Sequence, residues 1–479
     1  MQAISKKVIS YRTLILLLPS LILSFITYSF TVTDDNDFFS GKWYAFVIAF
    51  FVIMLLGIIV AYFSWKFEGY GLEADKIYYQ RGIIFRKKSS ILLENMQTLT
   101  YTEGLIEKIF GLATIRIDSG SANTLNDEIR FQSSKSDIIE FYTQLNKKEM
   151  PAKKNNDSQN QKKFTYQKGL KNLYLYTALL IFIVVFLMIV GFLIGGVIAK
   201  AEGDYYLFVV GIWGGILVFS LLISMLALYL SFYKYEVIST DTELLINYGF
   251  FIRHNNCIKK REIRAIQIHE NLFQKILGII DIKLHAVGYV NENNNNEAQT
   301  GILLPYLKKQ ELKTFLTTYL PEYSFSEPNT KGSKSLGFYL WYKLIILVGI
   351  FIISLFTALG FYLGTKTYMI SLMIVLFSFI ALAIIFLIIL LNDYLEFKGT
   401  SLSKTNDLLV ATNGGLSQNT YVIKVKRIVA FTECTTYLRK KHAVASYNIS
   451  FYANYLLSNV CIKMVDVKTK DYLLTLLNY

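Results

Sequence analysis

Long apolar segments, grouped in pairs, dominate the pattern of hydrophobic and polar positions along the chain. Apart from Lys343 near the start of the fifth segment, none of them contains Asp, Glu, Lys, Arg or His. A helix needs about 20 apolar residues to cross the hydrocarbon core of a bilayer. The pattern therefore predicts six transmembrane helices in three hairpins. Their expected positions are residues 13–30, 43–65, 172–199, 205–231, 338–364 and 367–391.

A more polar segment follows each apolar pair, and its pattern is typical of strands. In the first of these segments, residues 77–84 predict a strand that turns at Gly82, and residues 90–102 predict a second extended stretch. Residues 103–110 predict a short helix with Gly111 as its C-cap. Two further strands are expected around Ile115 and Ile129, and an amphipathic helix over residues 136–145 is expected to close a small sheet or barrel.

The first two polar segments are copies of each other. A shift of 167 residues aligns them without a gap, so that Gly82 meets Gly249 and Arg86 meets Arg253. The same shift aligns Leu-Ile-Glu-Lys-Ile-Phe-Gly at 105–111 with Leu-Phe-Gln-Lys-Ile-Leu-Gly at 272–278. An internal period of this kind predicts repeated copies of one structural unit.

The third polar segment is a more diverged copy. Gly415 stands for Gly249, and Tyr447, Ile449 and Phe451 keep the alternation of the matching strand, whereas Ala443 replaces a glycine. The segment also follows a pair of apolar stretches, which supports its assignment as a third copy.

These patterns define an expected domain organisation. Polar, linker-like composition separates the copies, and the stretch 291–297 is expected to be a disordered loop inside the second copy. The expected transmembrane hairpins are 1–65, 172–231 and 338–391, the soluble domains are 66–150, 232–323 and 392–479, and the linkers are 151–171 and 324–337.

Two spans, a strand with a glycine turn, the middle strand Leu92–Gln97, a short helix ending in Gly111 and an I-x-I strand form a recognisable series. This series resembles the bacterial PH-like type 2 domains of YdbS/YdbT-like membrane proteins, and the three copies are similar to the YdbT-like arrangement. The resemblance implies an α+β membrane protein in which each transmembrane hairpin is followed by a small PH-like antiparallel β domain with a C-terminal helix. It implies no established activity, but suggests roles at the cell envelope, including resistance to membrane-active compounds.

The charge distribution suggests how the chain lies in the membrane. All but three of the 49 Lys and Arg residues fall on one side of the expected hairpins, the exceptions being Lys42, Lys200 and Lys366. Basic loops stay in the cytoplasm, so a multi-pass protein of the cytoplasmic membrane with both termini in the cytoplasm is expected. This topology accounts for the net charge of +14 without nucleic acid as a partner. The three cysteines then lie on the reducing side and are expected to be free thiols.

Signatures of catalysis are missing from the sequence, so we expect no enzyme, no catalytic residue and no cofactor. His269-Glu270 begins like a zinc-protease motif, but Phe273 stands where the second histidine is needed. His254 and Cys257 have a metal-like spacing, yet two ligands are too few to predict a metal site.

A transporter or exporter component is the alternative class. Carriers place ionisable groups inside the membrane, where they are costly and functional, and the apolar segments offer none in their interiors. Glycines of the third and fourth spans, such as Gly195 and Gly214, are better explained by close helix packing than by a pathway.

Basic clusters next to the hairpins of each copy are the remaining candidates. They occupy similar places in the three segments and would face an anionic leaflet, where each charge adds about 1 kcal/mol of attraction. The alternative is a solvated strand edge whose charges discourage pairing between sheets. The candidate lipid or partner contacts are Arg86, Lys87, Lys88, Lys259, Lys260, Arg261 and Arg264; the third copy has Lys424, Lys426 and Arg427, and further on Arg439, Lys440, Lys441 and His442.

The expected function is a non-enzymatic platform at the cytoplasmic face of the membrane that binds or assembles other molecules. Its expected partners are the lipid bilayer, anionic phospholipid headgroups, other copies of itself, or a smaller YdbS-like membrane protein.

Overall fold

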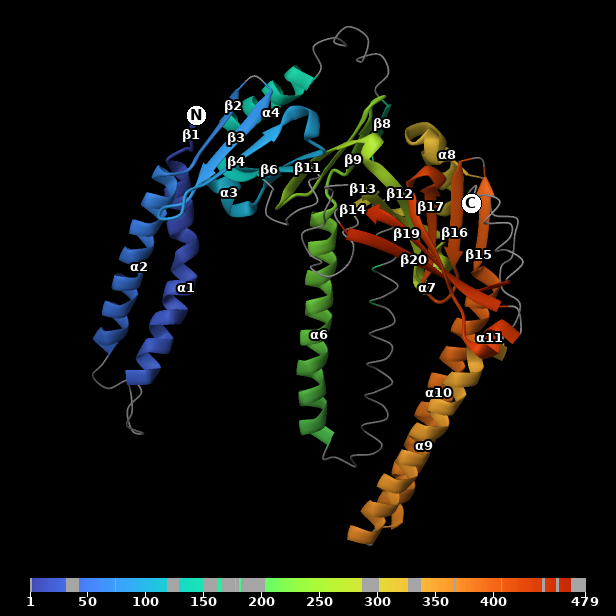
Figure 1. The fold of residues 1–479 in the computed structure, drawn as a ribbon. Helices are drawn as coiled ribbons and strands as arrows, with labels where there is room; N and C mark the ends of the chain where they lie inside the picture. Colours follow the sequence, from blue (N-terminus) through green and yellow to red (C-terminus); the bar gives the residue numbers. More distant parts are fainter. Residues whose placement is uncertain are drawn as a thin grey trace. The chain divides into compact units, whose positions relative to one another are not determined.

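A computed structural model describes the chain (Figure 1). The chain forms two compact units. The described residues are 2–31, 43–73, 75–118, 129–149, 162–165, 177, 181, 203–286, 301–325, 337–365, 368–405, 407–441, 444–453 and 456–466. Residues 1–168 and 181–262 form the first unit, and residues 169–180 and 263–479 form the second. The boundary between Glu262 and Ile263 falls in the middle of the second predicted domain, 232–323.

Apolar helices account for most of the predicted spans. Among the described residues, four helices are long and apolar enough to cross a membrane: α1 (Lys7–Thr31), α2 (Trp43–Lys66), α6 (Gly203–Ser231) and α10 (Tyr368–Gly399). The helix α9 (Gly337–Thr365) packs along α10, as α1 packs along α2. The predicted span 172–199, the loop 291–297 and most of both linkers lie outside the described residues.

In the first unit, the antiparallel strands β1 (Gln2–Ala3), β2 (Gly69–Glu73), β3 (Lys76–Arg81) and β4 (Lys87–Leu92) form a sheet in that order. The N-terminal residues thus belong to the soluble domain. Ile4 and Val8 are buried in its core, and the Trp65 indole donates to the carbonyl of Ile4 at 2.7 Å. Assigning all of residues 1–65 to a transmembrane hairpin was therefore wrong at its start, because burial of these side chains draws the chain into the sheet.

The second sheet of this unit joins strands from two copies of the repeat. Its order is β7-β6-β5-β11-β10-β9-β8, and all neighbours are antiparallel. The central pair is β5 of the first copy with β11 of the second. The strand bounds are β5 Thr98–Glu103, β6 Leu112–Asp118, β7 Ile129–Ser134, β8 Lys162–Thr165, β9 Glu236–Ser239, β10 Glu243–Tyr248 and β11 Arg253–Lys259.

The second unit repeats this construction. A six-stranded sheet has the order β14-β13-β12-β17-β16-β15 and joins the second copy to the third through β12 and β17. A three-stranded sheet, β18-β19-β20, completes the third copy. The bounds are β12 Ile263–Glu270, β13 Ile279–Ala286, β14 Gly301–Lys308, β15 Ser401–Thr405, β16 Leu408–Asn413, β17 Gln418–Lys424, β18 Ile428–Cys434, β19 Val444–Ala453 and β20 Leu456–Asp466.

The cores follow the predicted alternation. In the first copy, Ile115 and Ile117 of β6 are fully buried beneath the helix α4 (Lys135–Glu149), which contributes Ile138 and Phe141. Phe131 stacks on Tyr70 with 4.3 Å between ring centroids. In the third copy, the predicted residues Tyr447, Ile449 and Phe451 are fully buried in β19.

Short helices also follow the sequence. The helix α3 (Leu105–Phe110) ends at Gly111 with φ of +64°, and α7 (Leu272–Leu277) ends at Gly278 with φ of +65°, which confirms the predicted C-cap. The helix α8 (Leu312–Tyr319) packs Phe315 and Leu316 inward in the second copy. In the third copy, α11 (Tyr437–Lys441) follows β18 as α3 follows β5.

Two local predictions were wrong. The extended run 90–102 is broken by a 3-10 turn at Leu93–Asn95, which buries Leu93 and separates β4 from β5. Residues 162–165, assigned to the linker 151–171, form β8, because Phe164 pairs with Val237 and extends the seven-stranded sheet.

Candidate functional site

The strongest candidate for a functional surface is a set of hairpin tips that lie against the ends of apolar helices. The tips connect β3 to β4, β10 to β11 and β16 to β17, at residues 82–86, 249–252 and 414–417. Each tip contacts the C-terminal end of the helix that precedes its sheet, which is α2, α6 or α10 respectively. All three tips contain glycine at the turn, and the first two also present large apolar side chains.

The first tip exposes two large apolar side chains. Gly82 has φ of +112°, and a Cβ there would lie 2.0 Å from the carbonyl oxygen of Phe85, so the turn requires glycine. Ile84 is 85% exposed and Phe85 is 90% exposed. The Arg86 guanidinium lies 4.7 Å from the ring centroid of Phe67, which continues α2. The turn thus presents apolar side chains and a cation beside the end of an apolar helix.

The second tip is bonded to its helix through the backbone. The amide nitrogens of Gly249 and Phe250 each donate at 2.9 Å, to the carbonyls of Tyr233 and Leu230 at the end of α6. Phe250, Phe251 and Ile252 are 40%, 45% and 50% exposed. The Leu230 carbonyl also accepts from the Tyr233 amide at 3.4 Å, so the tip adds a second donor at the end of the helix.

The third tip has different chemistry. Gly414 lies so close to α10 that a Cβ would be 2.5 Å from the carbonyl oxygen of Leu395. The amide of Leu416 donates to the side-chain oxygen of Asn392 at 2.9 Å. The strand register aligns Gly414 with Gly249, so the predicted match of Gly415 with Gly249 was wrong by one residue. This tip keeps the contact with its helix, but it has Gly415 and Ser417 where the second tip has Phe250 and Ile252.

A lysine of the short helix reaches the tip of the following copy at both junctions. The Lys108 Nζ of α3 lies 5.7 Å from the ring centroid of Phe250. The equivalent Lys275 Nζ of α7 donates to the carbonyl of Gly415 at 2.6 Å, and burial lowers the pKa of this ammonium from its ordinary value. Exposed Ile109 and Ile276 follow one residue later, at 75% and 69% exposure.

Ion pairs join the helices where they meet the soluble domains. Arg12 of α1 bonds Glu68 beyond α2 at 2.5 Å, and the Tyr79 hydroxyl donates to the same carboxylate at 2.7 Å. Burial, together with this carboxylate, raises the pKa of Tyr79 well above its usual range. In the third copy, Lys343 of α9 pairs with the fully buried Asp393 of α10. Lys343 therefore marks a helix end with a paired charge.

The structure does not place the basic clusters in equivalent positions, contrary to the prediction. Arg86, Lys87 and Lys88 are exposed at the tip and at the start of β4. Lys259, Lys260 and Arg261 stand at the far end of β11 instead, a strand of seven residues that spans about 20 Å. The error came from counting charges after the glycine turn without fixing the strand register.

The second and third clusters do match each other and serve the junctions between copies. The Lys259 Nζ donates to the carbonyl of Met96 in the first copy at 2.7 Å. The equivalent Lys424 pairs with Glu322 and lies 4.9 Å from the ring centroid of Tyr323, both in the second copy. Arg264 is half-buried on β12, which belongs to the second compact unit.

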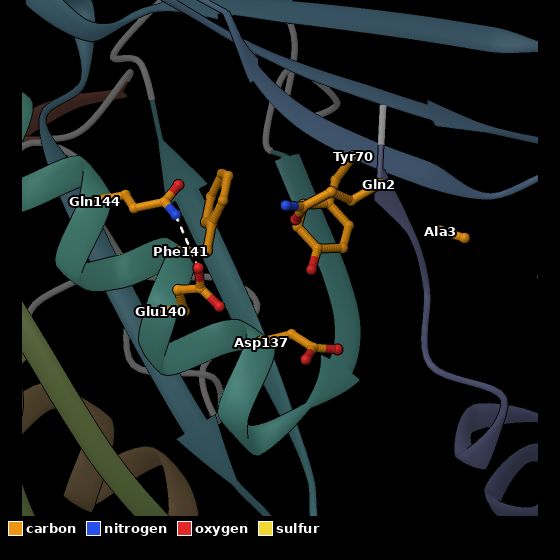
Figure 2. Close-up of a pocket in the computed structure, with 7 residues that line it drawn as sticks. All are labelled: Gln2, Ala3, Tyr70, Asp137, Glu140, Phe141 and Gln144. Carbon is orange, nitrogen blue, oxygen red and sulfur yellow. Dashed lines mark hydrogen bonds between the residues drawn. The ribbon is translucent and has the colours of Figure 1, made fainter.

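A shallow pocket of about 330 Å³ lies between β1, β2 and α4 (Figure 2). Its lining is polar and acidic: Gln2, Ala3, Tyr70, Asp137, Glu140, Phe141 and Gln144. The Gln144 amide donates to Glu140 at 3.1 Å, and Ser133 donates to Asp137 at 3.1 Å. The lining carries no histidine, cysteine or lysine, so it offers neither a soft metal ligand nor a nucleophile paired with a base.

The histidines and cysteines have structural surroundings in the described part of the chain. His254 stacks on Tyr248 at 4.8 Å, and no described group of three His, Cys, Asp or Glu could hold a metal ion. Cys257 is buried and its thiol donates to Glu243 at 3.5 Å, whereas Cys434 and Cys461 are exposed.

The chain matches known proteins over nearly its whole length. The model of the family described as Bacterial PH domain matches residues 7–149 and 178–323, more than half of the chain. The transmembrane protein YdbT of Bacillus subtilis (strain 168) is 22% identical over 494 residues, which cover 98% of this chain and 95% of the relative. No solved structure matches the chain.

These matches confirm the predicted resemblance, and the apolar helices agree with a transmembrane relative. The third copy, outside the residues that the family model matches, shares the strand order and junction of the other two. The chain is a membrane protein that belongs to the Bacterial PH domain family.

Proposed function

We propose that this protein is a non-enzymatic platform whose PH-like domains rest on the lipid headgroups of the membrane through the tips at 82–86 and 249–252. The observation that carries the proposal is the exposure of Ile84 and Phe85 beside the end of α2, at 85% and 90%. A helix end of this kind lies at the membrane surface, where an apolar tip can enter the interfacial region.

Energies of ordinary size support this contact. Burial of one large apolar side chain contributes about 1.5–3 kcal/mol, and each Lys or Arg near an anionic leaflet adds about 1 kcal/mol. Arg86, Lys87 and Lys88 follow the apolar tip directly and are exposed. Lys259 and its neighbours stand about 20 Å along β11 from the second tip. This separation exceeds the Debye length of about 8 Å at physiological salt, so the lipid contact rests on the first cluster.

We place the three soluble copies and both termini in the cytoplasm, with six spans arranged as three hairpins in the cytoplasmic membrane. The exposed thiols of Cys434 and Cys461 report on this topology. A membrane-impermeant maleimide should label them in inside-out vesicles and leave them unlabelled in sealed right-side-out vesicles. Labelling in right-side-out vesicles would show that the third copy lies outside.

The lipid contact is tested in the full chain, because β2 and β5 pair with β1 and β11, which lie outside residues 66–150. A polarity-sensitive fluorophore is attached at Phe85→Cys in a background without other cysteines, and the protein is reconstituted with headgroup-quencher lipids. The matched control is Glu94→Cys, an exposed residue beyond the opposite end of β4. We expect quenching at position 85 and little at position 94.

Charge dependence sharpens the same test. With anionic vesicles, R86Q, K87Q and K88Q together should weaken the quenching at position 85 and reduce its salt dependence, since exposed charges are screened by salt. Equal quenching at positions 85 and 94 would rule out a seated tip. If the quenching at position 85 changes neither with lipid charge nor with these substitutions, only the apolar side chains of the tip contact the membrane.

We also propose that this platform acts in envelope stress and in resistance to membrane-active compounds. A strain without the gene should become more sensitive to such compounds, and the intact gene should restore resistance. A gene encoding I84S and F85S should express at the same level and fail to restore it. Unchanged sensitivity in the deletion strain would exclude this role.

A further inference from the structure

The two junctions between copies are the same interface formed twice. In the first, Thr98 of β5 pairs with Ile258 of β11; in the second, Ala265 of β12 pairs with Ile423 of β17. Thr98 and Ala265 are equivalent positions of the repeat, as are Ile258 and Ile423. In the first and second copies, the first strand of the second half (β5 or β12) therefore pairs with the last strand of the first half of the next copy (β11 or β17), in the same register both times.

Further contacts recur around both strand pairs. Lys108 lies over Phe250 at the first junction, and its equivalent Lys275 bonds Gly415 at the second. A bulge-like shift in pairing follows Ile263 in β12 and, at the equivalent place, Ile428 in β18. β18 is therefore built like β12, the strand that forms the junction.

Each junction joins two kinds of strand edge, and the repeat has one edge of each kind at its two ends that forms no junction within the described strands. β4 is the equivalent of β11 and β17, and β18 is the equivalent of β5 and β12. Among the described strands, β4 ends the first sheet of unit one and β18 ends the last sheet of unit two. Ala265 in β12 is fully buried, whereas the equivalent Ala430 in β18 is exposed, as is Val429 at 48%.

We propose that β18 of one copy pairs with β4 of a second copy of this chain, so that the interface inside the chain continues between chains. The internal junctions fix the expected register, with Ala430 opposite Ile91. This register sets Glu433 opposite Lys88 and Cys434 opposite Lys87. Strand addition at an exposed edge is a general mode of protein recognition.

The chemistry of the two edges favours this occupant. Lys87 and Lys88 on β4 discourage pairing with an arbitrary strand, but Glu433 supplies an opposite charge at the place where the register needs it. Lys440 of α11 occupies the position of Lys108 and Lys275, and it would reach the tip beside Ile83 of the second copy. The ends differ from each other, so the association is head-to-tail and can extend to further copies.

This assembly adds to the proposed platform but does not depend on the lipid contact. The two proposals share Lys87 and Lys88. The lipid contact depends mainly on Ile84 and Phe85 in the turn, whereas the assembly depends on the backbone edge of β4, so the two are tested separately. Pairing of edges should persist in mild detergent, where no anionic leaflet is present.

Disulfide trapping tests the predicted register. At the second junction the pair equivalent to positions 434 and 87 is His269 with Asn419, whose side chains are in contact at 2.8 Å. We expect Lys87→Cys to form a disulfide with the native Cys434 of another copy in oxidised native membranes, in a Cys461→Ser background. The matched control is Lys88→Cys, which is equally exposed but points to the opposite face of the strand.

Two tagged versions establish that the link joins separate chains. One carries K87C with C434S and C461S, and the other keeps Cys434 and carries C461S alone. Coexpression should give a mixed dimer that carries both tags, and K87C with native Cys434 should give a ladder of larger species. A link formed within one chain, equal trapping at positions 87 and 88, or monomer alone would each overturn the proposal.

A measurement without engineered cysteines provides an independent check. The full chain in mild detergent should show a mass that rises with protein concentration through dimers and higher species. Val429→Lys and Ala430→Lys together should lower this association, because they add two charges to the exposed end of β18. A mass that stays monomeric over the whole concentration range would also overturn the proposal.

Discussion

At the scale of single residues, His285 links the core of the second unit to pH. Its side chain is 4% exposed, its ring centroid lies 5.4 Å from that of Phe451, and its Nε2 lies 3.1 Å from the Gln267 oxygen. Burial, and then the charge of Lys283, lowers the pKa of His285 from 6.5 to about 4. The folded state therefore keeps this imidazole neutral where the unfolded chain is already protonated.

We predict that this histidine makes the second unit less stable in mild acid. As pH falls from 6.5 towards about 4, the unfolded state binds a proton at His285 and the folded state does not. The free energy of unfolding therefore falls by about 1.4 kcal/mol per pH unit. Pulse proteolysis in urea at several pH values measures this loss. His285→Gln should flatten the dependence, and parallel curves for the two proteins would contradict the assignment.

A second prediction concerns the glycine of the second tip. Gly249 has φ of +104°, and a Cβ there would lie 1.8 Å from the carbonyl oxygen of Ile252, so Gly249→Ala should lower stability by about 1–3 kcal/mol. Gly111→Ala is the control, because φ is +64° and its nearest neighbour is the flexible end of Lys7 at 3.7 Å. Urea unfolding of the first unit should therefore separate the two variants, and equal losses would argue against a clash at Gly249.

At the scale of elements, the sequence predicted the type and position of helices and strands better than it predicted which strands pair. The 167-residue shift correctly aligned α3 with α7, and alternation correctly located buried Ile115 and Ile117. Strand pairing between copies was not predictable in the same way, because alternation specifies which face is buried and leaves open which edge is joined. The partner of Lys259 was missed for the same reason, since it is the carbonyl of Met96 across the junction.

The junction in the first unit is directly testable. Leu99 pairs with Cys257 across β5 and β11, and both side chains are buried. Leu99→Cys should form a disulfide with Cys257, whereas Thr100→Cys, which points to the other face, should not. A protease site placed between residues 151 and 161 lets a non-reducing gel show whether the two fragments remain linked. Separation of the fragments with Leu99→Cys would refute the strand pairing.

At the scale of the whole molecule, the repeat and the compact unit do not coincide. The first unit takes its last three strands from the second copy, and the boundary lies after Glu262. The polar composition of the linkers predicted them as domain boundaries. Backbone hydrogen bonds between strands do not depend on composition, so the compact units end elsewhere. A soluble domain of this chain therefore cannot be isolated by cutting at the predicted linkers without exposing the edge of a central strand.

Truncation tests this view of the units. A chain ending at Glu262 keeps β11 on β5 and should be monodisperse in detergent and resistant to protease. A chain ending at Glu149 exposes the edge of β5 and should aggregate or be degraded faster, as unpaired edges do. Size-exclusion profiles and digestion rates compare the two. Equal behaviour would mean that the junction contributes little to the first unit.

The junction also has a consequence for synthesis on the ribosome. Glu103 of β5 pairs with Arg253 of β11, 150 residues later in the chain. At about 5–20 residues per second, the edge of β5 waits about 8–30 s for its partner. During that interval a neighbouring nascent chain offers the same strand that β5 will later receive from its own chain. We expect strand exchange between neighbouring nascent chains to compete with closure within one chain during this interval.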